Sequence, residues 1–238
     1  MRRGSFLVVG LILLVTVSSG HGDSVAKRDL TDLDSLRGGA KVNALVDMVV
    51  AKQRSVSTLR ARFVQRKSSA LLLDPVSSTG DFRFLAPDRV RWDYEAPDRM
   101  VVVFSGETLT TYRPDDKSAE CVKIARKNQR FVKILAGTQP LDELREQFRI
   151  SLTDRGAPAP YVLTLEPIHR TLKRKIDRVL LEVDRQQLLP VVIEYAEADG
   201  DSTRYEFRSL EVDAGIDESV FALELGDDVR VETIDMSG

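Results

Sequence analysis

The sequence has little of what most catalytic sites require. Its 238 residues contain one cysteine, Cys121, and two histidines, of which only His169 lies beyond the N-terminal region. One cysteine cannot form an intramolecular disulfide, and two histidines cannot supply a histidine-rich metal site. The chain has no nucleophile-elbow serine, phosphate-binding glycine loop, HExxH or CxxC pair. We therefore expect no catalytic residue, no metal and no cofactor. A catalytic thiol is the alternative for Cys121, but a packed strand residue is the favoured interpretation.

An excess of charge of one sign is also lacking. The formal net charge is −2, and the charged residues, 30% of the chain, mix both signs. Such mixing is typical of a solvated surface and gives no reason to expect a nucleic-acid partner. Asp199-Gly200-Asp201 is interpreted as a hairpin turn between two strands, with calcium binding as a second interpretation.

The N-terminus has the form of a secretory signal peptide. Arg2 and Arg3 precede the apolar stretch from Phe6 to Val17, and small residues follow, so cleavage is expected near Gly20 to Gly22. An uncleaved anchor is the alternative, but a membrane span needs roughly 20 apolar residues. We expect a signal peptide over residues 1–20, a flexible leader over 21–39 and one domain over 40–235.

Alternating apolar and polar residues predict that most of this domain forms strands. The meander Gly80–Pro114 is the clearest case, because Phe82 and Phe84 alternate with charged residues and Trp92 and Tyr94 do the same. Further strands are expected at residues 58–66, 119–125, 148–152, 161–166, 176–183, 191–195 and 204–210. About ten to eleven strands, each with one apolar face, form a sheet wide enough to curl or close.

Helical spacing interrupts the strands in three places. Apolar residues recur every three or four positions from Val42 to Val50, over residues 126–136, and again from Pro140 onward. Each stripe must pack against an apolar surface. We expect these helices to cover the concave side of the sheet.

The meander also carries a family resemblance. Its order of glycine, proline and aromatic residues is similar to that of the periplasmic outer-membrane lipoprotein carrier family, the LolA type: Gly80, Phe82, Pro87, Arg89, Trp92, Tyr94, Pro97, Gly106, Leu109, Tyr112 and Pro114. The resemblance extends from the first helix through Phe63-Val64-Gln65 to the segment Ile216–Phe221.

The resemblance implies a mainly β (α+β) fold, an incomplete antiparallel β-barrel of about eleven strands with a helical lid enclosing an apolar cavity. It implies no enzymatic activity but a monomeric periplasmic chaperone that carries acylated lipoproteins or other lipids. Its partners would be an inner-membrane ABC-type release complex and an outer-membrane acceptor. The alternatives are a carrier of other lipids or glycolipids, and a sensor of mislocalised lipoproteins.

The resemblance further implies a set of lining and lid residues. The expected cavity lining is Phe63, Phe82, Phe84, Trp92, Tyr94, Val101, Val103, Leu163, Leu165, Ile193, Tyr195, Tyr205 and Phe207. The expected lid residues are Val46, Val49, Val50, Phe131, Leu135 and Leu144. One position departs from the family: Ala86 stands before Pro87, where members typically have an arginine that contacts the lid. Neither Arg89 nor Arg91 is expected to replace it. The sequence therefore does not indicate which residue would fasten the lid to the sheet.

Overall fold

The computed structural model of the protein describes residues 30–69, 74–124 and 141–236. Its strands are β1 (Thr58–Ser68), β2 (Val76–Leu85), β3 (Arg89–Ala96), β4 (Met100–Ser105), β5 (Thr108–Arg113), β6 (Ser118–Ile124), β7 (Phe148–Asp154), β8 (Tyr161–Pro167), β9 (Ile176–Val183), β10 (Pro190–Glu197), β11 (Ser202–Val212) and β12 (Arg230–Met236). Its helices are α1 (Leu30–Ser35), α2 (Gly38–Ser55), α4 (Leu141–Leu144), α5 (Arg170–Lys173) and the 3-10 helix η1 (Glu218–Phe221). In the described ranges no helix combines the length and apolarity needed to cross a bilayer.

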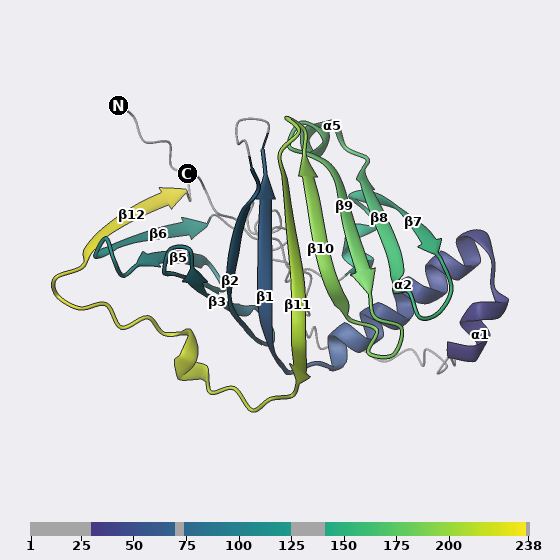
Figure 1. The fold of residues 1–238 in the computed structure, drawn as a ribbon, viewed down its shortest axis with the longest axis horizontal. Coiled ribbons are helices and arrows are strands. Elements are labelled where there is room, and N and C mark those ends of the chain that lie inside the picture. Colours follow the sequence, from purple (N-terminus) through teal and green to yellow (C-terminus); the bar gives the residue numbers. More distant parts are fainter. Residues whose placement is uncertain (1–29, 70–73, 125–140, 237–238) are drawn as a thin grey trace.

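All twelve strands join one sheet in the order β12-β6-β5-β4-β3-β2-β1-β11-β10-β9-β8-β7. Neighbouring strands are antiparallel except β12, which runs parallel to β6. The long strands β1 and β11 pair at the centre, and β7 and β12 form the two outer edges. The sheet curves strongly and is not closed into a barrel (Figure 1), as expected for so many twisted strands.

The long helix α2 lies behind the half of the sheet formed by β7 to β9 in the view of Figure 1. Its apolar stripe, which includes Leu45, Val46, Val49 and Val50, is buried and joins one hydrophobic core with the strands. We call the sheet face turned toward this helix the inner face, and the opposite one the outer face. The sheet thus has one apolar face that is partly covered by a helix.

The structure confirms the predicted fold class and corrects several elements. The expected leader of residues 21–39 contains α1, whose Leu33 is buried, and α2 begins at Gly38, ahead of the predicted Val42. β12 and α5 were not predicted. The predicted signal peptide and the predicted helix of residues 126–136 lie outside the described residues, whereas the helix expected after Pro140 is present as α4.

Candidate functional site: the inner face of the sheet

Register places the aromatic residues of the central strands together on the inner face. Phe63 lies opposite Phe207 on one side and Gly80 on the other, and Phe82 lies opposite Trp92. Directly opposed residues of antiparallel strands share a face, so β11, β1, β2 and β3 point these side chains the same way. All of the aromatic residues among them are buried.

The rings form a continuous cluster around Trp92. The ring centroid of Trp92 lies 4.6 Å from that of Phe63, 4.8 Å from that of Phe82 and 5.0 Å from that of Tyr205. Phe63 meets both Trp92 and Tyr94 edge to face, which is a favoured geometry for aromatic pairs. In this state the rings pack on one another, so a ligand can reach this part of the inner face only by displacing them.

The other half of the inner face is mostly aliphatic. One ladder runs across four strands, from Leu163 through Leu181 and Ile193 to Tyr205. A second ladder runs beside it through Leu165, Val179 and Tyr195. The expected lining residues Leu163, Leu165, Ile193 and Tyr195 therefore share a face with the aromatic cluster.

A small buried polar group lies at one border of the aromatic cluster. The Gln65 side-chain amide donates to the Tyr205 hydroxyl at 2.5 Å, and both side chains are buried. Burial raises the pKa of Tyr205 well above its ordinary value, and it raises the pKa of Tyr195 to about 12. These hydroxyls remain neutral at physiological pH, so the inner face carries no tyrosinate charge.

The register corrects the predicted positions of two lining residues. Val101 and Val103 lie opposite Asp93 and Arg91, on the outer face, whereas Val102 lies opposite Trp92. Val102 and Phe104 are the β4 residues that belong to the hydrophobic core with the aromatic cluster. The physical reason is that residues 100–104 are apolar without alternation, so the sequence does not indicate which side faces inward.

The expected lid residues are only partly described. Val46, Val49 and Val50 on α2 and Leu144 on α4 are buried in the core. Phe131 and Leu135 lie outside the described residues. The ion pair Arg54–Asp142 at 2.7 Å joins α2 to α4, and Arg145, which directly follows α4, pairs with Asp47 of α2 at 2.9 Å; both pairs are solvent-exposed.

A cluster that sequence reasoning missed ties α2 to the edge of the sheet. Asp154, at the end of β7, accepts hydrogen bonds from Lys41 of α2 at 2.7 Å and from Arg185. Burial alone would raise the pKa of Asp154, but its bonds from Lys41, the Gly156 amide and Arg185 outweigh burial and lower the pKa to about 2. The bond to Asp154 likewise raises the pKa of Lys41. Because these residues are far apart in the chain, no local sequence pattern indicates the cluster.

Ala86, at the position where the resemblance implies an arginine, packs against the core. Neither nearby arginine replaces it. Arg91 pairs with Asp93 on the outer face and donates to the Val220 carbonyl at 2.7 Å, and Arg89 pairs with Glu218. Both arginines hold η1, which contacts β3 and β4, and neither reaches α2 through these bonds. A different ion pair, Lys41–Asp154, joins helix α2 to the end of β7.

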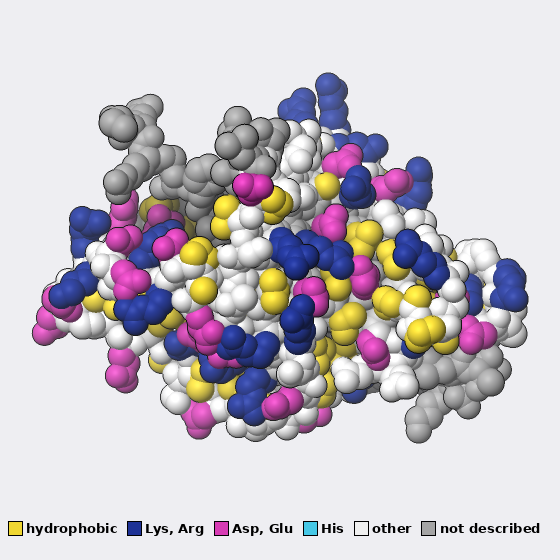
Figure 2. All heavy atoms as spheres, viewed as in Figure 1, with side chains coloured by type: hydrophobic (Ala, Val, Ile, Leu, Met, Phe, Trp, Pro, Cys, Tyr) yellow, Lys and Arg dark blue, Asp and Glu magenta, His cyan; other side chains and the backbone are white. Residues whose placement is uncertain are grey.

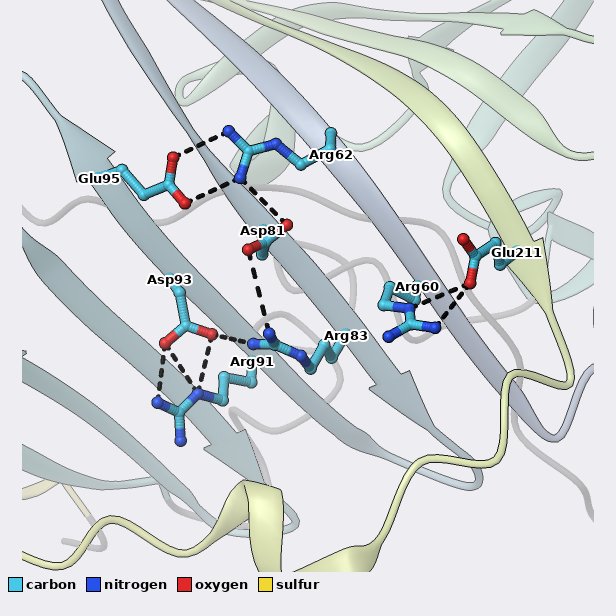
Figure 3. A network of polar contacts seen from close by, with 8 residues as sticks. All are labelled: Arg60, Arg62, Asp81, Arg83, Arg91, Asp93, Glu95 and Glu211. Carbon is cyan, nitrogen blue, oxygen red and sulfur yellow. Dashed lines mark hydrogen bonds and ion pairs between the residues drawn. The ribbon is translucent and has the colours of Figure 1, made fainter.

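The outer face is covered by paired charges. Arg62 donates to both carboxylate oxygens of Glu95 at 2.8 Å, and Arg60 is paired with Glu211 at 2.7 Å (Figure 3). In Figure 2, lysine and arginine side chains are mixed with aspartate and glutamate over this face, with apolar side chains between them. Exposed pairs of this kind contribute little stability, about 0–1 kcal/mol each, but they keep the outer face solvated.

The residues considered for catalysis are far apart in the sheet. Cys121 lies half-buried on β6 and accepts a weak hydrogen bond from Thr110 at 3.9 Å, while His169 follows β8 and its ring contacts the Glu146 carbonyl at 3.0 Å. Eight strands lie between β6 and β8 in the order of the sheet. Among the described residues no group of three or more His, Cys, Asp or Glu side chains is placed to hold a metal ion.

Comparisons with known proteins agree with the geometry. The family model of the outer membrane lipoprotein carrier protein LolA matches residues 54–224. A curated outer-membrane lipoprotein carrier protein from Alkalilimnicola ehrlichii is 31% identical over 172 residues, which cover 71% of this chain and 74% of the relative.

Solved structures were matched as well. An uncharacterized conserved protein from Thermus thermophilus matches with a TM-score of 0.51 at 8% identity, covering 80% of this chain and 98% of that one. A LolA superfamily protein from Nitrosomonas europaea matches with a TM-score of 0.43 at 10% identity, covering 76% of this chain and 97% of that one. At such identity, the likeness to the Thermus protein concerns the fold alone.

Proposed function

The chain belongs to the LolA family of outer membrane lipoprotein carrier proteins, and we propose that it carries lipoproteins by holding their acyl chains against the inner face of the sheet. The observation that supports this proposal best is the continuous apolar inner face of an open sheet. Each methylene removed from water is worth roughly 0.8 kcal/mol, so a carrier of long acyl chains needs such a surface.

The finer parts of the proposal follow from the family. The carrier would act in the periplasm after export by the N-terminal segment, without covalent chemistry. It would receive its cargo from an inner-membrane ABC-type release complex and pass it to an outer-membrane acceptor. The ligand would contact the aromatic cluster and the aliphatic ladders, with Val102 and Phe104 in place of Val101 and Val103.

Mass spectrometry of the protein purified from its native host tests the proposal. We expect a co-purifying peptide with an acylated N-terminus. Recovery of the folded protein without any acylated peptide, under conditions in which the host makes lipoproteins, would contradict it. Recovery of free lipids alone would favour a lipid carrier over a lipoprotein carrier.

Two substitutions on one strand provide a matched control. Val102→Thr adds a hydroxyl to the inner face, and Val101→Thr adds the same group to the outer face at nearly unchanged volume. Val102 is already buried in the free protein, so the added hydroxyl should lower the free energy of unfolding by about 1–3 kcal/mol before any ligand binds. The first variant should also bind an acylated peptide more weakly, because an acyl chain offers the hydroxyl no hydrogen bond. The second variant should bind it as the natural protein does.

A further inference from the structure

A cavity of about 750 Å³ lies between the start of α2 and the edge strand β7. Its volume is within the range of small-molecule sites, about 300–1,000 Å³. Because β7 is the last strand of the sheet among the described residues, no described strand lies beyond this edge. The cavity is therefore an opening at the seam between helix and sheet, separate from the aromatic cluster around Trp92.

The floor of the cavity is apolar. Val42, Ile150 and Leu152 line it, and all three are half-buried side chains packed against the core. Ile150 lies opposite Leu165 and Leu152 opposite Leu163, so the floor continues the aliphatic part of the inner face. A hydrocarbon chain on this floor would cover apolar surface that the fold leaves partly open.

The rim of the cavity carries more positive than negative charge. Arg37, Lys41 and Arg185 line it, together with the carboxylates of Asp34 and Asp154. Asp154 is shared between Lys41 and Arg185, and Arg185 also lies 3.9 Å from the ring centroid of Tyr161.

Arg37 is the rim cation that no described carboxylate neutralises. Its guanidinium donates to the backbone carbonyls of Asp34 at 2.6 Å and Leu36 at 2.9 Å. Within the part of the chain that the structure describes, no carboxylate is paired with it. Asp34 makes one long contact, 3.4 Å to Lys41, and its side chain is 67% exposed. An anion at this rim would meet a cation that is not already neutralised.

We propose that this cavity binds a single-chain anionic amphiphile. The acyl chain lies on the floor of Val42, Ile150 and Leu152, and the carboxylate or phosphate head group lies at the rim beside Arg37. Lys41 and Arg185 add positive potential behind it, although Asp154 already holds them. The site goes beyond the carrier function. It shares no residue with the aromatic cluster or with the two aliphatic ladders, although its floor adjoins the ladders at Leu163 and Leu165.

Calorimetric titration of the full chain tests the site with three probes of equal chain length: sodium decanoate, decyl phosphate and 1-decanol. We expect both anions to bind about five- to tenfold more tightly than the alcohol at low salt. This preference should shrink at high salt, because the rim is exposed to solvent. Equal affinity for decanoate and decanol, or no binding of any probe, would overturn the proposal.

A steric variant asks whether the probes occupy this cavity. Gly39 borders it three residues before Val42, and a Cβ at Gly39 would meet no atom within 4 Å. Gly39→Leu should therefore fold, place a side chain in the cavity and weaken decanoate binding by about tenfold. Ala51→Leu adds the same side chain at an exposed position of the same helix and should leave binding unchanged. Unchanged binding in a folded Gly39→Leu protein would place the probe elsewhere.

A charge variant keeps the site testable even if the steric variant misfolds. Arg37→Gln should weaken decanoate and decyl phosphate binding about three- to tenfold and leave 1-decanol binding unchanged. Lys173→Gln, in a second cavity of about 450 Å³ near α5, is the matched control and should change neither. If Lys173→Gln rather than Arg37→Gln lowers anion affinity, the site proposed here is wrong. Lipoprotein co-purification is measured separately, so failure of the carrier function and failure of this site are distinguishable.

Discussion

Gly80 lies where β2 passes close to the backbone of β3 and to the Phe63 ring. A Cβ at this position would come within 2.0 Å of the Asp93 carbonyl oxygen and 2.9 Å of Phe63 Cε1. Both atoms are held, one by the β2–β3 pairing and the other by the aromatic cluster. The glycine is thus required by close packing on both sides, and it allows the Phe63 ring to lie over the sheet beside Trp92.

We predict that Gly80→Ala lowers the free energy of unfolding by about 2–4 kcal/mol, because backbone and ring must both shift to admit one methyl group. Gly39→Ala is the matched control, since its Cβ meets no atom within 4 Å and alanine favours a helix by roughly 1 kcal/mol over glycine. Urea denaturation measures both. Equal stability of the two variants would show that the sheet adapts to the methyl group at no cost.

The carboxylate of Asp154 predicts a pH dependence of stability. Its pKa is lowered to about 2, against an ordinary value near 4 in the unfolded chain. A carboxyl whose pKa is lowered by folding stabilises the fold fully above the unfolded value, and this stabilisation is lost as pH falls through the folded value. The relevant window is therefore about pH 4 down to pH 2.

We expect Asp154→Asn to be less stable than the natural protein at pH 6 by about 1–3 kcal/mol, and the difference to shrink across that window. Asp115→Asn removes an exposed carboxylate paired with Arg99 and should show a much smaller difference at every pH. Urea denaturation between pH 2 and pH 6 measures this. A difference between Asp154→Asn and the natural protein that is constant with pH would contradict the assigned role of the Lys41–Asp154–Arg185 cluster.

The inward-facing side of a strand could be predicted from the sequence most securely where alternation is strict. Phe82 and Phe84, like Trp92 and Tyr94, are separated by charged residues, and all four lie on the inner face as expected. The run from Met100 to Phe104 has no such separation, and there the choice of Val101 and Val103 was wrong. The Lys41–Asp154–Arg185 cluster depends on how α2 crosses the edge of the sheet, which no local pattern encodes.

At the scale of elements, most strands could be predicted from their period of two, and the long helix from its period of three to four. The parallel strand β12 was missed because it follows a long irregular segment and its side chains are exposed, so burial gives it no strong pattern. Short helices such as α5, with one buried residue, are too brief to show a period. Elements without a buried stripe were therefore the ones that the sequence could not indicate.

The contrast between the exposed edge strand β12 and the buried interior strands predicts unequal local stability. β12 pairs with a single strand, and Val231 and Ile234 are 51% and 37% exposed, whereas β1 pairs on both sides and carries buried Phe63. Native-state hydrogen exchange should show β12 amides exchanging at least about a hundredfold faster than those of β1, because local opening of an edge strand exposes little apolar surface. Amides of β10, another interior strand, provide the control and should resemble β1. Equal protection of β12 and β1 would mean that the edge unfolds only with the whole sheet.

At the scale of the whole molecule, the packed inner face and the proposed acyl cargo compete for the same surface. Each ring pair around Trp92 contributes about 0.5–1.5 kcal/mol beyond burial. Transfer of a sixteen-carbon acyl chain out of water is worth roughly 12 kcal/mol. One chain can therefore offset the loss of several ring contacts, and an unloaded carrier with a packed interior is compatible with tight binding of cargo.

This competition can be followed with one chromophore, because Trp92 is the only tryptophan and contacts Phe63, Phe82, Tyr94, Tyr205 and Phe207. We expect a synthetic triacylated lipopeptide to change the intensity and wavelength of Trp92 emission in a saturable manner, since acyl chains that occupy the inner face must separate these rings. The same peptide without acyl chains should leave the emission unchanged. Decanoate in the cavity between α2 and β7 should also leave it unchanged, because that cavity does not border Trp92. Lipopeptide binding with constant emission would place the acyl chains away from the aromatic cluster.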